Sequence, residues 1–138
     1  MKTVFLSIKY HEDHANRFLV DEISTALEKA GWGSFCVARD VEQWGKQSYP
    51  ANELMRRTFS AIDDCTVVLV ELSEKGVGVG IEAGYATAHG KPVFAVACMP
   101  AEISATLRGI AREVYSYREV ADLTQWLSSG VLDAGLRG

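Results

Sequence analysis

Residues 65–72 form a nearly unbroken apolar run, CTVVLVEL, which constrains the fold more than any other segment. A run of this kind does not alternate between a buried and a solvated face, so it predicts a strand that is covered on both faces. Strands covered on both faces are typical of parallel sheets, whose connections are crossover helices. This segment therefore indicates an α/β protein.

The rest of the sequence contains the other strands and helices that a parallel sheet needs. Apolar runs predict strands over residues 3–8, 34–38, 91–97 and 113–117. Helical spacing of apolar side chains predicts helices over residues 14–30, 50–64, 80–89, 101–109 and 118–129. This alternation predicts a flavodoxin/Rossmann-like three-layer sandwich with a five-stranded parallel sheet of strand order 2-1-3-4-5. Ligands would bind between the first and third strands, where residues 7–10 should meet residues 71–82.

The chain has 138 residues, the size of one ordinary domain, and we expect residues 1–138 to form a single domain. Hydrophobic residues make up 48% of the chain, which is typical of a folded protein rather than a disordered one. Residues 130–138 are expected to be a loose tail or to pack on a partner.

Charge and composition exclude several classes of partner. The 14 Lys and Arg residues are scattered and outnumbered by 18 Asp and Glu residues, so we do not expect binding to a nucleic-acid polymer. Apolar stretches stay well short of the roughly 20 residues that a membrane span needs. Residues 1–8 do not resemble a secretory leader, so a cytoplasmic protein without membrane contact is expected.

The cysteines and histidines have no metal-ligand or disulfide pattern. Cys36, Cys65 and Cys98 are odd in number, lack a CxxC pair and lie in or beside apolar runs, which predicts free thiols packed in the core. The histidines at positions 11, 14 and 89 lack metal-ligand spacing and are expected to be packed or exposed side chains. Neither a metal nor an organic cofactor is predicted.

The glycine-rich segment from Gly76 to Tyr85 joins the buried strand to a helix. Free backbone N–H groups and the positive end of the helix dipole would meet there, which predicts an anion site. Gly78, Gly80 and Ala83 fit the glycine pattern of dinucleotide-binding folds, but they follow the third predicted strand rather than the first. A hydride-transferring dinucleotide enzyme is therefore disfavoured.

Glu82 is the only charged residue among the thirteen residues from Gly76 to Ala88. Burying a carboxylate among glycines and apolar side chains costs free energy unless backbone amides or a ligand compensate it. One interpretation is an acid in the first turn of a helix, which the helix dipole stabilises. The other is a nucleophile that the dipole keeps ionised and that small neighbours leave open to a substrate.

Ser7-Ile8-Lys9 ends the first predicted strand, and Asp64 precedes the buried one. Gly78-Val79-Gly80-Ile81-Glu82-Ala83-Gly84 is followed by Gly90-Lys91-Pro92-Val93. Together these segments resemble the nucleoside 2-deoxyribosyltransferase-like superfamily, which includes nucleoside deoxyribosyltransferases and 5′-monophosphate N-glycosidases. The resemblance covers roughly residues 3–98, and its most specific part is the spacing from GVGIEAG to GKPV.

The resemblance implies an enzyme that cleaves or transfers the N-glycosidic bond of a nucleoside or nucleotide. In that superfamily the glutamate that matches Glu82 attacks C1′ of the sugar, and water or a second base resolves the glycosyl-enzyme intermediate. The residues that match Ser7, Ile8 and Lys9 line the sugar and base pocket, and Tyr10 would lie beside them. The resemblance also implies a homodimer or larger homo-oligomer, and the mechanism needs no cofactor.

Two positions depart from the monophosphate-cleaving members of that superfamily. Gly76 stands where they have a serine that holds the 5′-phosphate, and Arg56 stands where they have a functional aspartate. Either the substrate lacks that phosphate or other groups replace the serine. The candidate groups are Ser73, Lys75 and the backbone N–H groups of Gly76 and Gly78. Gly80 is a further candidate substrate-binding residue.

The polar loop over residues 40–49 is a candidate lid over the site. Trp44 and Tyr49 could stack on a base, and Asp40 or Glu42 could assist its departure as a proton donor. We take Asp40 with Glu82 as the candidate catalytic residues and Trp44 as a substrate-binding residue. The competing interpretations are a turn acid for Asp40 and an aromatic cover over the sheet edge for Trp44.

Two other functions are compatible with the same residues. Phe5-Leu6-Ser7, followed by a polar turn and Asp13, also resembles the opening of Toll/interleukin-receptor domains. Those domains have a similar fold and a catalytic glutamate, and the chain would then cleave NAD at its nicotinamide bond. A non-catalytic module that binds a nucleotide for signalling is the third hypothesis, since Gly76 and Arg56 replace functional residues of the superfamily.

Overall fold

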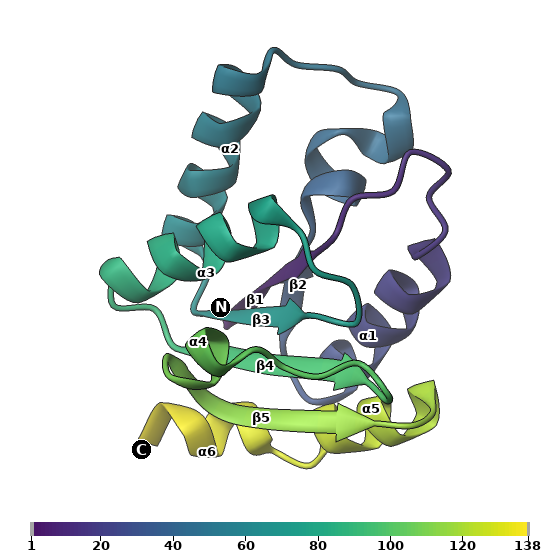
Figure 1. Ribbon diagram of the computed structural model, residues 1–138, viewed down its shortest axis with the longest axis vertical. Helices are drawn as coiled ribbons and strands as arrows, with labels where there is room; N and C mark the ends of the chain where they lie inside the picture. The colour runs from purple at the N-terminus through teal and green to yellow at the C-terminus, as the bar shows by residue number, and fades with distance from the viewer. Residues whose placement is uncertain (1, 138) are drawn as a thin grey trace.

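The computed structural model describes residues 2–137 and contains one five-stranded, all-parallel sheet of order β2-β1-β3-β4-β5 (Figure 1). The strands are β1 (Thr3–Ile8), β2 (Gly33–Phe35), β3 (Val67–Glu71), β4 (Val93–Cys98) and β5 (Ala111–Tyr117). The helices are α1 (Arg17–Lys29), α2 (Ala51–Asp64), α3 (Val77–Ala88), α4 (Ala105–Arg108), α5 (Val120–Ser128) and α6 (Val131–Arg137). The predicted fold class and strand order are confirmed.

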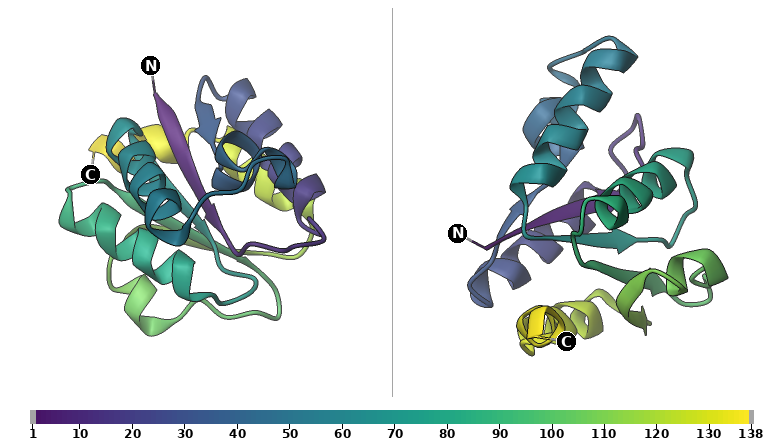
Figure 2. Two further views of the ribbon diagram at one scale, coloured as in Figure 1. Left: turned by 90° about the horizontal axis from the view of Figure 1, so that it is seen from above. Right: turned by 90° about the vertical axis from the view of Figure 1, so that its left-hand side faces the viewer.

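Helices cover both faces of the sheet, as the apolar run at 65–72 requires. Helices α1, α5 and α6 pack on one face, and α2, α3 and α4 pack on the other (Figure 2). Successive residues of β3 point to opposite faces, so Leu69 belongs to the first core and Val70 to the second. All five residues of β3 are buried, including Glu71.

The second strand is shorter than predicted because the chain turns sharply after Phe35. Residues Val37–Val41 form a π-helical turn, η1, and Gln43–Gly45 form a 3₁₀ turn, η2. The Asp40 carboxylate accepts a hydrogen bond of 2.9 Å from the backbone N–H of Cys36, which closes this turn. Val37 and Ala38, which the sequence places in a strand, therefore lie in a helical turn.

Helix α3 begins at Val77, earlier than the predicted start near Gly80. Glu82 consequently lies in its second turn instead of its first. The helix dipole acts mainly through the first turn, so it stabilises the Glu82 carboxylate less than the sequence interpretation assumed.

The expectation of a loose tail after residue 130 is wrong, because residues 131–137 form α6 on the core of the sheet. Leu132 is 1% exposed and packs in the same cluster as Phe94 of β4. Gly135 lies so close to the Phe94 ring that a Cβ atom there would come within 2.4 Å of its Cζ. The apolar pattern of a seven-residue helix is too short to distinguish it from a coil in the sequence.

The three cysteines are free thiols, with Cys36 and Cys65 buried and Cys98 half-buried. Within residues 2–137, each helix is too short or too polar to cross a lipid bilayer. That same part of the chain brings together no three side chains of the kinds that bind metal ions.

Candidate active site

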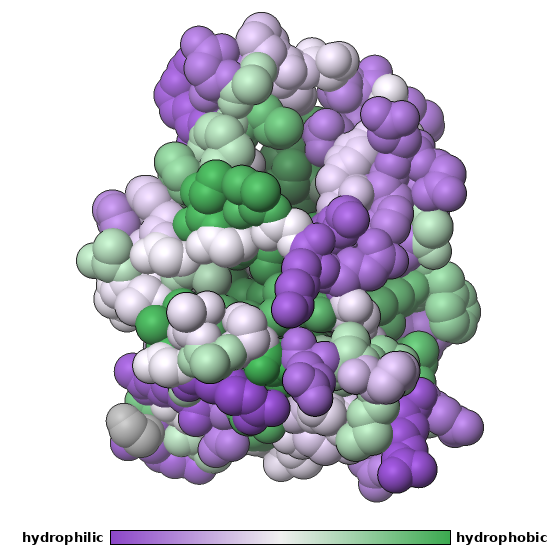
Figure 3. All heavy atoms as spheres, viewed as in Figure 1, coloured by the Kyte–Doolittle hydropathy of each residue, from purple (hydrophilic) through white to green (hydrophobic). Residues whose placement is uncertain are grey.

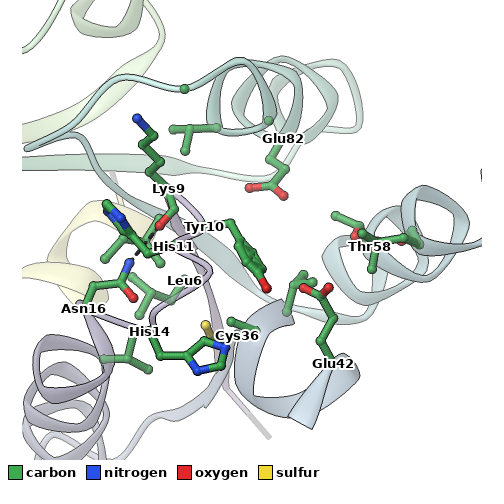
Figure 4. Close-up of a pocket in the computed structure, with 18 of the residues that line it drawn as sticks. Leu6, Lys9, Tyr10, His11, His14, Asn16, Cys36, Glu42, Thr58 and Glu82 are labelled. Atoms are coloured by element: carbon green, nitrogen blue, oxygen red, sulfur yellow. Dashed lines mark hydrogen bonds between the residues drawn. The ribbon is translucent and has the colours of Figure 1, made fainter. Parts of the chain in front are cut away.

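A cavity of about 640 Å³ opens at the carboxyl ends of β1 and β3, at the switch point of the sheet (Figure 4). This volume lies within the usual range for small-molecule sites. The predicted site residues that line it are Ile8, Lys9, Tyr10, Trp44, Gly76, Gly78 and Glu82. The predicted meeting of residues 7–10 with the start of α3 is therefore correct.

Glu82 projects from α3 into the cavity. Its Oε1 accepts a hydrogen bond of 2.5 Å from the hydroxyl of Ser7, which is buried at the end of β1. Burial raises the pKa of Glu82 from its ordinary 4.5 to about 7, and the bond from Ser7 opposes this rise. Glu82 is thus a positioned carboxyl group that changes charge near neutral pH.

The start of α3 forms one end of the cavity. Gly76 precedes the helix, no side chain caps it, and Gly76 and Gly78 both line the cavity. The Lys9 side chain packs against Gly76, 3.5 Å from where a Cβ atom would be, and its Nζ lies 3.8 Å from Glu74. Backbone N–H groups at a helix start and a nearby ammonium group are a suitable environment for an anion.

Two rings from separate loops form the opposite wall. The rings of His14 and Trp44 meet edge to face at 5.4 Å, and the guanidinium of Arg17 lies 4.9 Å from the Trp44 ring centroid. His14 and Trp44 both have left-handed backbone conformations, with φ of 55° and 54°. Such conformations are costly for residues other than glycine and are typical of functional sites. These contacts hold Trp44 in the wall of the cavity.

Glu42 is the acidic residue of the 40–49 loop that enters the cavity, and Asp40 does not (Figure 4). The Asp40 carboxylate is held outside by Arg39, at 2.8 Å, and by the Cys36 N–H group. Burial raises the pKa of Glu42, and the nearby His14 lowers it. The structure thus favours the turn interpretation of Asp40 and not its placement beside Glu82.

The cavity lining also excludes four other predicted residues: Ser73, Lys75, Gly80 and Tyr49. The Ser73 hydroxyl donates to Glu71 at 2.6 Å and accepts from the N–H of Cys98 at 2.8 Å, so it ties the end of β3 to β4. Gly80 and Lys75 line a separate crevice between α3 and α4. Tyr49 lies under the guanidinium of Arg57, at 4.3 Å, away from the cavity.

Several residues that line the cavity were not predicted as site residues from the sequence. Leu54, Met55 and Thr58 lie on one face of α2, and their helical spacing is a signal that could have located them. His14 and Asn16 come from the loop before α1, whose course no periodic pattern describes.

Comparison with known proteins identifies a family. A family model described as nucleoside 2-deoxyribosyltransferase matches residues 7–122. A protein of Thermofilum pendens is 30% identical over 133 residues, which cover 91% of this chain and 92% of that protein. It carries the provisional name 2′-deoxynucleoside 5′-phosphate N-hydrolase 1.

Two solved structures have the same fold. The CMP N-glycosidase of Clostridium botulinum superposes with a TM-score of 0.69 at 20% identity, covering 91% of this chain and 98% of that one. A 2-deoxyribosyltransferase of Bacillus psychrosaccharolyticus superposes with a TM-score of 0.64 at 15% identity, covering 88% of this chain and 90% of that one.

Proposed function

The chain belongs to the nucleoside 2-deoxyribosyltransferase family, and from this premise we propose that it cleaves or transfers the N-glycosidic bond of a nucleoside or nucleotide with Glu82 as nucleophile. The names of its relatives, an N-hydrolase, an N-glycosidase and a deoxyribosyltransferase, support this class of reaction. The observation that carries the proposal is the Glu82 carboxyl group, which enters the cavity and is oriented by Ser7 at 2.5 Å.

The chemistry follows from the position of Glu82. Its ionised carboxylate attacks C1′ of the sugar while the bond from C1′ to the base nitrogen breaks, and that electron pair leaves with the base. The base takes up a proton from solvent, and the sugar remains as an ester of Glu82. Water, or the ring nitrogen of a second base, then attacks C1′; Glu82 leaves as a carboxylate and the proton of the attacking group returns to solvent.

An anion at the 5′ position of the sugar would be accommodated at the start of α3. Gly76 stands in place of the phosphate-binding serine, and the backbone N–H groups at the start of α3 together with Lys9 would bind the anion instead. The cavity is large enough for a nucleotide as well as a nucleoside.

The proposal is tested by chromatographic detection of free base after incubation with nucleosides, their 5′-monophosphates and NAD, with and without a second base as acceptor. Base release by the wild type and not by Glu82→Gln is the expected result. Release of nicotinamide from NAD alone would favour the Toll/interleukin-receptor-like activity instead. Tight nucleotide binding without turnover of any substrate would contradict an enzymatic role.

The pH dependence of turnover gives a second test. Only the ionised form of Glu82 is nucleophilic, so kcat/KM of the wild type should rise with pH and level off above about 7. Ser7→Ala removes a hydrogen bond that lowers the pKa of Glu82, so the rise should move to higher pH. We expect roughly tenfold lower kcat/KM at pH 6 and a smaller loss at pH 9. An equal loss at both pH values would contradict this role of Ser7.

We also propose a homo-oligomer in which α3 contributes to the contact. Val77 is 82% exposed and Ile81 is 45% exposed, and hydrophobic side chains gather over this part of α3 (Figure 3). Exposed apolar patches of this kind mark interaction surfaces. Light scattering on the purified protein is expected to give a mass above that of one chain, and replacing both residues with serine is expected to lower it. A monomer at all concentrations would contradict the proposal.

A further inference from the structure

This inference rests on the proposed function. We propose that Glu42 accepts a hydrogen bond from the departing base and thereby selects bases that carry an exocyclic amino group. Cytosine, adenine and guanine would be favoured over uracil, thymine and hypoxanthine.

The cavity has two chemically different ends, and Glu82 lies between them. The end at Gly76, Gly78 and Lys9 suits an anion, so it would hold the 5′ side of the sugar. Away from Lys9, the cavity is lined by the rings of Tyr10 and Trp44 and by apolar residues of α2, which suit the flat faces of a base. With C1′ beside Glu82, the base therefore extends toward Glu42.

The Glu42 side chain is aimed into this end of the cavity. Figure 4 shows its carboxyl group pointing to the space beside Tyr10, on the same side as the carboxyl group of Glu82. Among residues 2–137, no hydrogen bond or ion pair engages the Glu42 carboxylate, although the residue is half-buried. A half-buried carboxylate gains free energy when a ligand supplies a hydrogen-bond donor.

The backbone of Glu42 is held in place before any ligand binds. Its N–H donates to the carbonyl of Val37 at 3.0 Å, and its carbonyl accepts from the N–H groups of Gly45 and Gln47, each at 3.0 Å. Burial raises the pKa of Glu42, and the nearby His14 opposes this rise and so favours the charged form. The backbone thus places the Glu42 side chain at the cavity before a ligand binds, and acceptors placed in advance discriminate between ligands.

An ionised carboxylate can only accept hydrogen bonds. The amino groups of cytosine, adenine and guanine are donors. Uracil, thymine and hypoxanthine keep a ring N–H donor, but at the position of the amino group they have a carbonyl oxygen or a hydrogen on carbon. A Glu42 carboxylate placed against that position would face a second acceptor or lose a donor. Glutamine at position 42 has both a donor and an acceptor, and it would accept either class of base.

The test compares substrates that differ only in this group: the cytosine and uracil nucleotides, and the guanine and hypoxanthine nucleotides, each with the same sugar. We expect wild-type kcat/KM to favour the amino-bearing member by about tenfold or more. Glu42→Gln should bring each ratio to within about threefold of one. The matched control is Asp40→Asn, which removes a carboxylate from the same loop outside the cavity while its amide oxygen can still accept the bond from the Cys36 N–H, so it should keep the wild-type ratios. Thermal unfolding checks that each variant is folded.

Calorimetric titration of the same nucleotide pairs into Glu82→Gln, with and without Glu42→Gln, separates this inference from the proposed activity. One outcome is that amino-bearing nucleotides bind more tightly in a way that depends on Glu42, while the wild type turns over none of them. That result would support base selection by Glu42 and overturn the proposed glycosidase activity. Glu82-dependent base release with equal kcat/KM for both members of each pair, or with ratios unchanged in Glu42→Gln, would overturn the selection by Glu42.

Discussion

Replacing Glu82 with glutamine is expected to lower kcat by a factor on the order of 10³ or more while the protein stays folded. Glutamine has nearly the same size, and its oxygen can still accept the hydrogen bond from Ser7. Its neutral amide cannot form the glycosyl ester, so the reaction loses its nucleophile. Single-turnover release of base, followed by chromatography, measures the loss. Turnover close to that of the wild type would contradict the assignment of Glu82.

The same substitution should also stabilise the protein at alkaline pH. The pKa of Glu82 is about 7 in the folded chain and near 4.5 when unfolded, so the folded state holds the proton more tightly between these values. The free energy of unfolding of the wild type therefore falls as the pH rises from about 4.5 to about 7. Above that range the buried carboxylate costs up to about 3 kcal/mol, which glutamine avoids.

Urea unfolding of both proteins at pH 4.5 and pH 8.5 measures this effect. The variant should match the wild type at the lower pH and exceed it at the higher pH. A parallel pH dependence of the two proteins would show that the Glu82 carboxyl group is not desolvated. Because this readout does not involve substrate, it stands apart from the loss of turnover.

Replacing Leu132 with alanine is expected to lower the free energy of unfolding by about 2–5 kcal/mol. Leu132 is 1% exposed and anchors α6 in the core that lines the α1 face of the sheet. The helix is further attached through Asp133, which pairs with Lys2 and accepts a bond of 3.4 Å from the Trp32 ring N–H. Loss of the Leu132 side chain leaves a cavity that these polar contacts do not fill.

Leu136→Ala is the matched control for this measurement, because the same type of side chain in the same helix is only partly buried there. We expect it to cost roughly half as much or less, since it removes less buried apolar area. Equal and small effects of the two substitutions in urea unfolding would indicate that α6 does not pack as described.

Most of the fold could be predicted because it depends on local apolar patterns. The run at 65–72 predicted a strand buried on both faces, and β3 is buried along its whole length. The ends of strands and helices were harder to predict where hydrogen bonds to backbone N–H groups determine them. The chain leaves the sheet after Phe35 because the Asp40 side chain bonds the Cys36 N–H, a contact that no periodicity encodes.

By itself, the sequence determined the parallel sheet and the meeting of residues 7–10 with the glycine-rich segment that carries Glu82. Both follow from side-chain periodicity and from the rule that places ligands at the switch point of such sheets. Only the tertiary structure decided that Glu42 and not Asp40 enters the cavity, and that residues 131–137 join the core. These outcomes depend on hydrogen bonds within an irregular turn and on packing between segments far apart in the chain, and neither leaves a periodic pattern in the sequence.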